Sequence, residues 1–138
     1  MGLNVKHIGV ENMSKNKILV IDDEADIVDT VAFMLRSRGY DVITACDGGE
    51  GLTKIMLEQP DLVLLDIVMP VMDGFEVCHK LKRDKDAKKI PVIMFTARGD
   101  NEAVIKAKQF GADDYIVKPF NLPTLVNKIN RLITKQSS

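Results

Sequence analysis

The sequence has little of several things that would point to particular classes of protein. It holds two cysteines, Cys46 and Cys78, and two histidines among 138 residues. The cysteines stand in no CxxC or Cys/His spacing, so we expect two reduced thiols, with a single disulfide as the alternative. No apolar run approaches the roughly 18 residues that a membrane span requires, and the N-terminus lacks the apolar core of a signal peptide. We therefore predict a cytoplasmic protein with no membrane partner.

Net charge is also nearly absent. Nineteen basic and twenty acidic residues give a net charge of -1, and the two signs are interspersed. Nothing global therefore attracts the chain to nucleic acid, and we expect no direct nucleic-acid binding by this domain. The length is that of one domain. Residues 1–15 show no clean periodicity and are predicted to be a flexible extension, with one domain over residues 16–138.

From Lys17 onward, short apolar runs alternate with helical patterns. The runs predict five strands, at residues 18–21, 40–45, 62–65, 92–95 and 115–117. Apolar residues at helical spacing predict helices over residues 27–35, 49–58, 75–83, 101–110 and 122–133. Gly39 is expected to end the first helix in a left-handed conformation. The alternation predicts an α/β fold with a parallel sheet, right-handed crossovers and helices on both faces.

Polar residues stand where the predicted strands end. Acids follow the first and third strands, at Asp22, Asp23 and Asp66, while the fourth and fifth strands end in Thr96 and Lys118. In a parallel sheet the carboxyl ends of the strands meet at one edge, where function gathers near the reversal of strand order. A single Asp commonly caps a helix, and a single Lys is commonly solvated. Five such residues at one edge favour a functional site.

The kinds of side chain at this edge indicate phosphoryl chemistry. Clustered carboxylates repel one another unless a cation neutralises them. Oxygen ligands without His or Cys suit Mg²⁺ and argue against Zn²⁺. A carboxylate can itself act as a nucleophile and form an aspartyl phosphate. Phosphoryl transfer then needs positive charge and donors around the phosphoryl oxygens, which Mg²⁺, Lys118, Thr96 and backbone amides would supply.

These residues lie in motifs that resemble the signature of bacterial response-regulator receiver domains, the phosphoacceptors of two-component systems. The motifs, in order, are Asp22-Asp23, residues 66–74 (DIVMPVMDG), Thr96-Ala97 and Lys118-Pro119-Phe120. The resemblance implies a five-stranded, doubly wound, flavodoxin-like sheet with strand order 2-1-3-4-5. It implies a signalling phosphoprotein, not an enzyme, that catalyses only its own phosphorylation and dephosphorylation. The partners it implies are a sensor histidine kinase or a histidine phosphotransfer protein, and an output partner or domain.

The resemblance also implies a role for each motif residue. Asp66 would accept the phosphoryl group, which Lys118 and Thr96 would contact. The Mg²⁺ ligands would be Asp23, Asp66, the backbone carbonyl of Val68 and, through water, Asp22. The Lys118-Pro119 peptide would be cis.

Tyr115 matches the aromatic switch position of the family. Its ring is expected to move inward as Thr96 shifts toward the phosphate. The signal would then leave through the face formed by the helix at 101–110, the strand at 115–117 and the final helix. Arg98, at a position that varies within the family, is expected to place a long cation near the phosphoryl group.

Other interpretations fit the sequence less well. A phosphate loop at residues 47–51 would need Lys-Ser/Thr, and a haloacid-dehalogenase-type phosphatase would need an Asp in place of Val68. A flavin-binding module would need a hydroxyl-rich loop where Asp22 and Asp23 stand. Two hypotheses stay open: a signalling module that binds a separate partner, or a receiver whose output domain lies beyond Ser138. A metabolic enzyme is a distant third.

Overall fold

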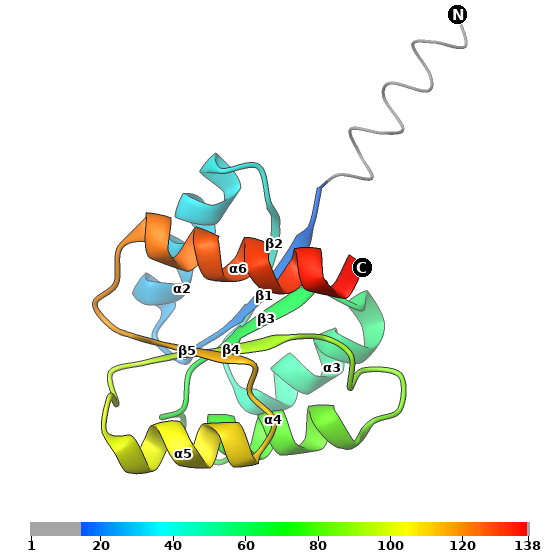
Figure 1. Ribbon diagram of the computed structural model, residues 1–138, viewed down its shortest axis with the longest axis vertical. Coiled ribbons are helices and arrows are strands. Elements are labelled where there is room, and N and C mark those ends of the chain that lie inside the picture. Colours follow the sequence, from blue (N-terminus) through cyan, green and yellow to red (C-terminus); the bar gives the residue numbers. More distant parts are fainter. Residues whose placement is uncertain (1–14, 138) are drawn as a thin grey trace, which may run out of the picture.

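A five-stranded parallel sheet lies between two layers of helices in the computed structural model, which describes residues 15–137 (Figure 1). The elements are β1 (Lys17–Ile21), α2 (Ala25–Ser37), β2 (Asp41–Ala45), α3 (Gly48–Glu58), β3 (Leu62–Leu65), α4 (Gly74–Arg83), β4 (Val92–Thr96), α5 (Asn101–Gln109), β5 (Asp114–Val117) and α6 (Leu122–Ser137). Each predicted strand and helix is present, with small differences at the ends. The predicted N-terminal extension lies outside the described residues, apart from Lys15.

The strand order is β2-β1-β3-β4-β5, and every neighbouring pair is parallel. This confirms the doubly wound, flavodoxin-like order. The chain runs outward from β1 to β2 and then crosses back to β3, so the strand order reverses between β1 and β3. In that pair Ile21 lies opposite Leu65. The residues that follow these two strands, Asp22 and Asp66, therefore start side by side at the reversal point.

Each face of the sheet has its own hydrophobic core. Helices α2 and α6 cover one face, where Leu35 and Ile129 pack with Ile18 and Phe95 (Figure 1). Helices α3, α4 and α5 cover the other face. Successive residues of a strand point to opposite faces, so a strand covered on both sides must be apolar throughout. The four residues of β3 meet this requirement and are fully buried.

Helix α2 is rotated relative to the predicted apolar stripe. Its buried residues are Val28, Val31, Ala32 and Leu35, whereas Ile27 and Met34 are only half-buried. Those two side chains line a groove beside Phe120 in the segment between β5 and α6. The apolar stripe is therefore shared between the sheet and this segment.

Several local features match the sequence expectations. Gly39 follows α2 with φ +93°, in the left-handed conformation predicted for it. The two cysteines are free thiols, with Cys46 exposed and Cys78 buried, so the disulfide alternative is not realised. Within residues 15–137 no helix has the length and apolar character needed to cross a membrane.

Candidate functional site

Three carboxylates converge at the reversal point of the sheet. Asp22 and Asp66 are buried, with 0% and 4% of their surface exposed, while Asp23 is exposed. One oxygen from each of the three lies within 4.8 Å of the others. The structure thus brings together the acids that the sequence placed at the ends of two separate strands. The two buried acids form the floor of the cluster, and Asp23 stands on its solvent side.

Backbone hydrogen bonds fix the two buried carboxylates. The Asp66 N–H donates to the carbonyl of Ile21 (3.0 Å), and Asp66 Oδ1 accepts the N–H of Ile67 (2.8 Å). Asp22 Oδ1 accepts the N–H of Glu24 (3.0 Å). One oxygen of each acid is therefore engaged by the backbone. The other oxygen of each, Oδ2, faces the side chain of Lys118.

Lys118 supplies the cation inside the cluster. Its Nζ lies 2.6 Å from Asp22 Oδ2 and 3.7 Å from Asp66 Oδ2. The ammonium also stands over the ring of Phe95, 4.6 Å from the centroid, a contact that the sequence analysis did not foresee. Residue 118 reaches the site because Val117 pairs with Thr96 at the ends of β5 and β4. The Lys118-Pro119 peptide is cis, as the family resemblance implied.

The charge balance of the cluster leaves Asp66 costly to ionise. Burial raises the pKa of Asp66 above its usual value, and the neighbouring Asp22 raises it further. Lys118, the Thr96 hydroxyl and the Ile67 N–H lower the pKa, but they do not cancel the rise. The cluster holds three carboxylates, and Lys118 contacts only Asp22 and Asp66 among them, so its positive charge does not balance the negative charge of the cluster. The cluster is therefore chemically suited to a second cation, and its all-oxygen donor set fits Mg²⁺.

We expect Asp66→Asn to make the metal-free protein more stable at neutral pH. The raised pKa means that the folded protein binds the Asp66 proton more tightly than the unfolded chain does. The contribution of the protonated Asp66 carboxyl to stability is therefore fully present below its ordinary pKa of 3.8 and is lost as the pH rises through the raised pKa of the folded state. The amide of Asn does not ionise, so the variant avoids this loss. Urea unfolding of both proteins over a pH series would measure the difference.

The advantage of Asp66→Asn should shrink as the pH falls toward 3.8, where the parent carboxyl also becomes neutral. Asp29→Asn, which removes an exposed acid of α2, is the matched control and should show no such pH-dependent gain. If Asp66→Asn were less stable than the parent at neutral pH, the Lys118 contact would outweigh burial and the Asp22 repulsion, and the account of the site's electrostatics would be wrong.

The hydroxyl and the switch residue lie beside the cluster. Thr96 is fully buried at the end of β4, and its Oγ1 accepts a long hydrogen bond from the N–H of Arg98 (3.4 Å). The Tyr115 hydroxyl donates to the carbonyl of Arg98, so one loop residue contacts both. Tyr115 is half-buried against the core under α3, α4 and α5. Its expected motion on phosphorylation stays a prediction.

Arg98 forms ion pairs at the start of α5, and its expected place near the phosphoryl group stays a prediction. Its guanidinium donates to both carboxylate oxygens of Asp100, at 3.2 and 3.1 Å, and lies 3.9 Å from Glu102. Asp100 is the N-cap of α5. Its carboxylate is therefore fixed at the start of the helix, where Arg98 pairs with it. An Asp directly before a predicted helix, two residues after an Arg, was the sequence signal for this pair.

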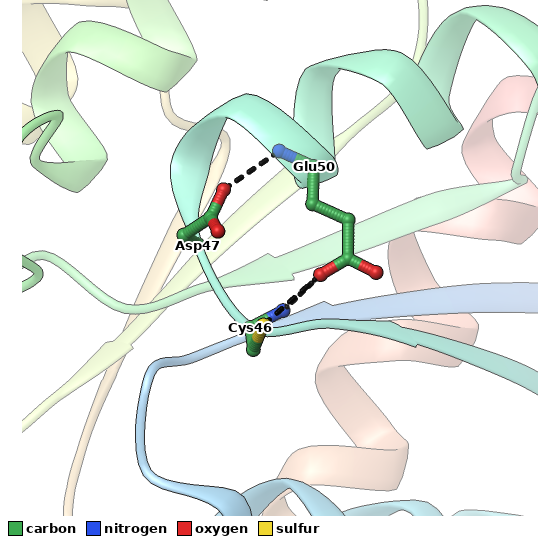
Figure 2. Close-up of side chains that lie close together, drawn as sticks. All are labelled: Cys46, Asp47 and Glu50. Atoms are coloured by element: carbon green, nitrogen blue, oxygen red, sulfur yellow. Dashed lines mark hydrogen bonds between the residues drawn. The ribbon is translucent and has the colours of Figure 1, made fainter.

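A second group of possible metal ligands, Cys46, Asp47 and Glu50, is a helix start. Asp47 accepts the N–H of Glu50 (2.8 Å), and Glu50 Oε1 accepts the N–H (2.8 Å) and the thiol (3.1 Å) of Cys46 (Figure 2). The other Glu50 oxygen pairs with Lys54 at 3.2 Å. These bonds, led by the Cys46 N–H, lower the pKa of Glu50 to about 2. The carboxylates of Asp47 and Glu50 thus accept hydrogen bonds at the helix start in a pattern similar to a capping box. This role agrees with the rejection of a phosphate loop here.

The fold and the strand-end site together define a signalling domain, and the family model for the response regulator receiver domain matches residues 18–130. The chain belongs to this family. Receiver domains are phosphoacceptors of two-component systems and not classical enzymes, and they generally use Mg²⁺ at the phosphorylation site. Members of the family interact with histidine kinases.

Relatives with described roles include several transcriptional regulators. The probable transcriptional regulator ycf27 of Cyanophora paradoxa is 46% identical over 123 residues, which cover 89% of this chain and 50% of that protein. The DNA-binding dual master transcriptional regulator RpaA of Synechocystis is 41% identical over 119 residues, covering 86% and 49%. The chain thus spans about half the length of the curated relatives that it matches.

Solved structures of similar fold include chains that this domain covers almost completely. The chemotaxis protein CheY4 of Vibrio cholerae superposes with a TM-score of 0.82 and 35% identity, covering 86% of this chain and 99% of that chain. A CheY-like receiver domain protein from Methanospirillum hungatei gives a TM-score of 0.84 and 35% identity, covering 90% and 98%. Both kinds of relative therefore share this domain.

Proposed function

We propose that Asp66 accepts a phosphoryl group from a histidine kinase or a histidine phosphotransfer protein, and that the domain switches its output face in response. The observation that carries the proposal is the set of groups around Asp66 Oδ2. This oxygen belongs to a buried carboxylate held in place by the Ile67 N–H, and it faces the Lys118 ammonium 3.7 Å away. A fixed carboxylate beside an ammonium and a hydroxyl is suited to nucleophilic attack on phosphorus.

The proposed transfer uses few groups of the protein. Asp66 Oδ2 attacks the phosphorus of the phosphohistidine, the new P–O bond forms, and the P–N bond breaks. The imidazole leaves with the electron pair and takes up a proton. Charge spreads over the phosphoryl oxygens during the transfer, and the Lys118 ammonium and the Thr96 hydroxyl can donate to them. Hydrolysis would be a separate step: a water would attack the same phosphorus, the bond from phosphorus to Asp66 Oδ2 would break, and inorganic phosphate would leave while the Asp66 carboxylate is restored.

The carboxylate cluster would hold the Mg²⁺ that such a transfer requires. Asp22, Asp23 and Asp66 provide oxygens within 4.8 Å of one another, with the exposed Asp23 on the solvent side. The ion would neutralise the carboxylates and offset the phosphoryl charge. The further assignments, to the carbonyl of Val68 and to water-mediated binding by Asp22, stay predictions.

Lys118 must change partner during this cycle. In the present arrangement its ammonium is closer to Asp22 (2.6 Å) than to Asp66 (3.7 Å). An ion bound by Asp22 would take over the neutralisation of that carboxylate. The ammonium would then be free to move toward a phosphoryl group on Asp66. In this proposal the Asp22–Lys118 ion pair belongs to the unphosphorylated, metal-free state.

The proposed output face consists of α5, β5 and α6. Thr96 and Tyr115 border it, and Arg98 links the two. Residues 16–138 would form the receiver, with the phosphoryl group biasing a balance between two conformations. Because the curated relatives are about twice as long and include a DNA-binding regulator, we propose an output domain in the same polypeptide as the target, with a separate partner protein as the alternative.

Labelling by a small phosphodonor tests the proposed function. Incubation with acetyl phosphate and Mg²⁺ should add one phosphoryl group, and peptide mass spectrometry after borohydride trapping should place it on Asp66. Asp66→Asn should abolish the label, because an amide oxygen is a poor nucleophile. Chelation of Mg²⁺ should abolish it in the parent.

Asp73→Asn is the matched control for this experiment. Asp73 lies in the same loop and caps α4 through the N–H of Glu76 (3.0 Å), and Asn caps a helix as well as Asp does. The control should therefore take the label like the parent. Labelling that persists in Asp66→Asn, or a label found on Ser, Thr or His, would contradict the proposal.

A further inference from the structure

The loop between β4 and α5 joins the phosphorylation site to the output face through one residue. The backbone N–H of Arg98 donates to the hydroxyl of Thr96 (3.4 Å), and its carbonyl accepts the hydroxyl of Tyr115. Its guanidinium donates to both oxygens of Asp100, at 3.2 and 3.1 Å. Thr96, Tyr115 and the start of α5 are therefore all bonded to Arg98.

Asp100 holds the far end of this arrangement. Besides Arg98, its carboxylate accepts the N–H of Ala103 (3.1 Å) and thereby caps α5. Hydrogen bonding to Arg98 is the main cause that lowers the pKa of Asp100, so the pair is ionised over the ordinary pH range. A two-pronged Arg–carboxylate pair fixes orientation as well as distance. Both side chains are substantially exposed, at 38% and 50%, so the pair contributes little to stability.

The ion pair spans the glycine of the loop. Gly99 separates Arg98 from Asp100, and a glycine there would let the two halves of the loop move independently. A contact that adds little stability but spans this glycine would tie the loop to the first turn of α5.

We propose that Asp100, acting through Arg98, couples the phosphorylation site to α5; this inference rests on the proposed function. When the Thr96 hydroxyl turns toward a phosphoryl oxygen, the N–H of Arg98 loses its acceptor and the loop shifts. The Arg98–Asp100 pair passes this shift to α5, where it would otherwise be absorbed at Gly99. The start of α5, and not only the ring of Tyr115, thus carries the signal to the output face.

The test compares Asp100→Asn with the parent by amide chemical shifts at saturating beryllofluoride and Mg²⁺. Asn keeps the helix cap but loses the charge that holds Arg98. We expect the shift changes over α5 (Asn101–Gln109) to fall about twofold or more, within the range that residues along a coupling path produce. The amides of Ile67 and Gly74, beside Asp66, should still respond. Asp47→Asn, which alters the cap of α3, should leave the α5 response unchanged.

A double-mutant cycle separates coupling through Arg98 from a simple capping role. If Asp100 acts through Arg98, Asp100→Asn should add nothing to the loss already caused by Arg98→Gln. Additive losses, or a parent-like α5 response in Asp100→Asn, would overturn the inference. If beryllofluoride failed to move the Ile67 and Gly74 amides in the parent itself, the proposed phosphorylation site would be wrong instead, so the two failures are distinguishable.

Discussion

Mg²⁺ should raise the melting temperature of the parent protein, and Asp23→Asn should lose most of that rise. The ion would bind the folded site, where one oxygen from each carboxylate lies within 4.8 Å of the others, and it would stabilise the fold by mass action. At about 100 times the dissociation constant the gain is about 2.7 kcal/mol, or roughly 8 °C for a domain of this size. Asp23 is the exposed member of the cluster, so its replacement removes a ligand without disturbing the buried floor.

Two further variants make the Mg²⁺ experiment specific. Asp29→Asn removes an exposed acid of α2 and should keep the full effect of Mg²⁺, which controls for general charge. Lys118→Met should bind Mg²⁺ more tightly, because the ammonium 2.6 Å from Asp22 competes for the same carboxylate. Thermal melts over a Mg²⁺ titration would measure all three. An Asp23→Asn protein that responds to Mg²⁺ like the parent would refute the metal assignment.

Gly74→Ala should damage both the fold and the site. A Cβ at residue 74 would lie 2.2 Å from the carbonyl oxygen of Asp66 and 2.8 Å from the Cα of Ile67. Both are backbone atoms, and the Gly74 N–H donates to the Ile67 carbonyl (2.8 Å). The clash can therefore be relieved only by a shift of the backbone. We expect a loss of about 3 kcal/mol or more in the free energy of unfolding. Urea denaturation would measure it.

Gly74→Ala should also lose phosphorylation. The loop from Asp66 to Gly74 must shift to relieve the clash, and this loop begins at the proposed phosphoacceptor. Labelling by acetyl phosphate, under conditions where the variant is still folded, would show this. Gly49→Ala is the matched control in α3, where the added Cβ would have only an ordinary contact of 3.5 Å with Asp47. A helical Gly→Ala change of this kind should stabilise by up to about 1 kcal/mol. Equal urea midpoints for Gly74→Ala and the parent would contradict the expected clash.

The fold was largely predictable because its elements differ in local pattern. Residues 62–65 are apolar throughout, and the structure buries them on both faces as β3. Gly39 ends α2 in the left-handed conformation expected from its type. The rotation of α2 was not predictable in the same way. Ile27 and Met34 fit the helical period, but which side faces the sheet depends on the segment around Phe120, about ninety residues further along the chain.

The candidate site was predictable as a set of residues because the ends of parallel strands share an edge. Asp22, Asp66, Thr96 and Lys118 were named on that ground, and the structure brings them together. Their order in the chain says nothing about which of them pair. That Lys118 lies closer to Asp22 than to Asp66 depends on the register of β5 on β4 and on a long side chain resting over Phe95.

The sequence by itself determined the alternating elements and the oxygen-rich set of side chains at the strand ends, because periodicity and residue type are local properties. Only the tertiary structure decided that Asp23 is exposed while Asp22 is buried, and that Arg98 pairs with Asp100. Neighbouring residues of identical type receive different surroundings when the chain folds. Burial, pairing and pKa depend on those surroundings, and they are the properties on which the chemistry of this site rests.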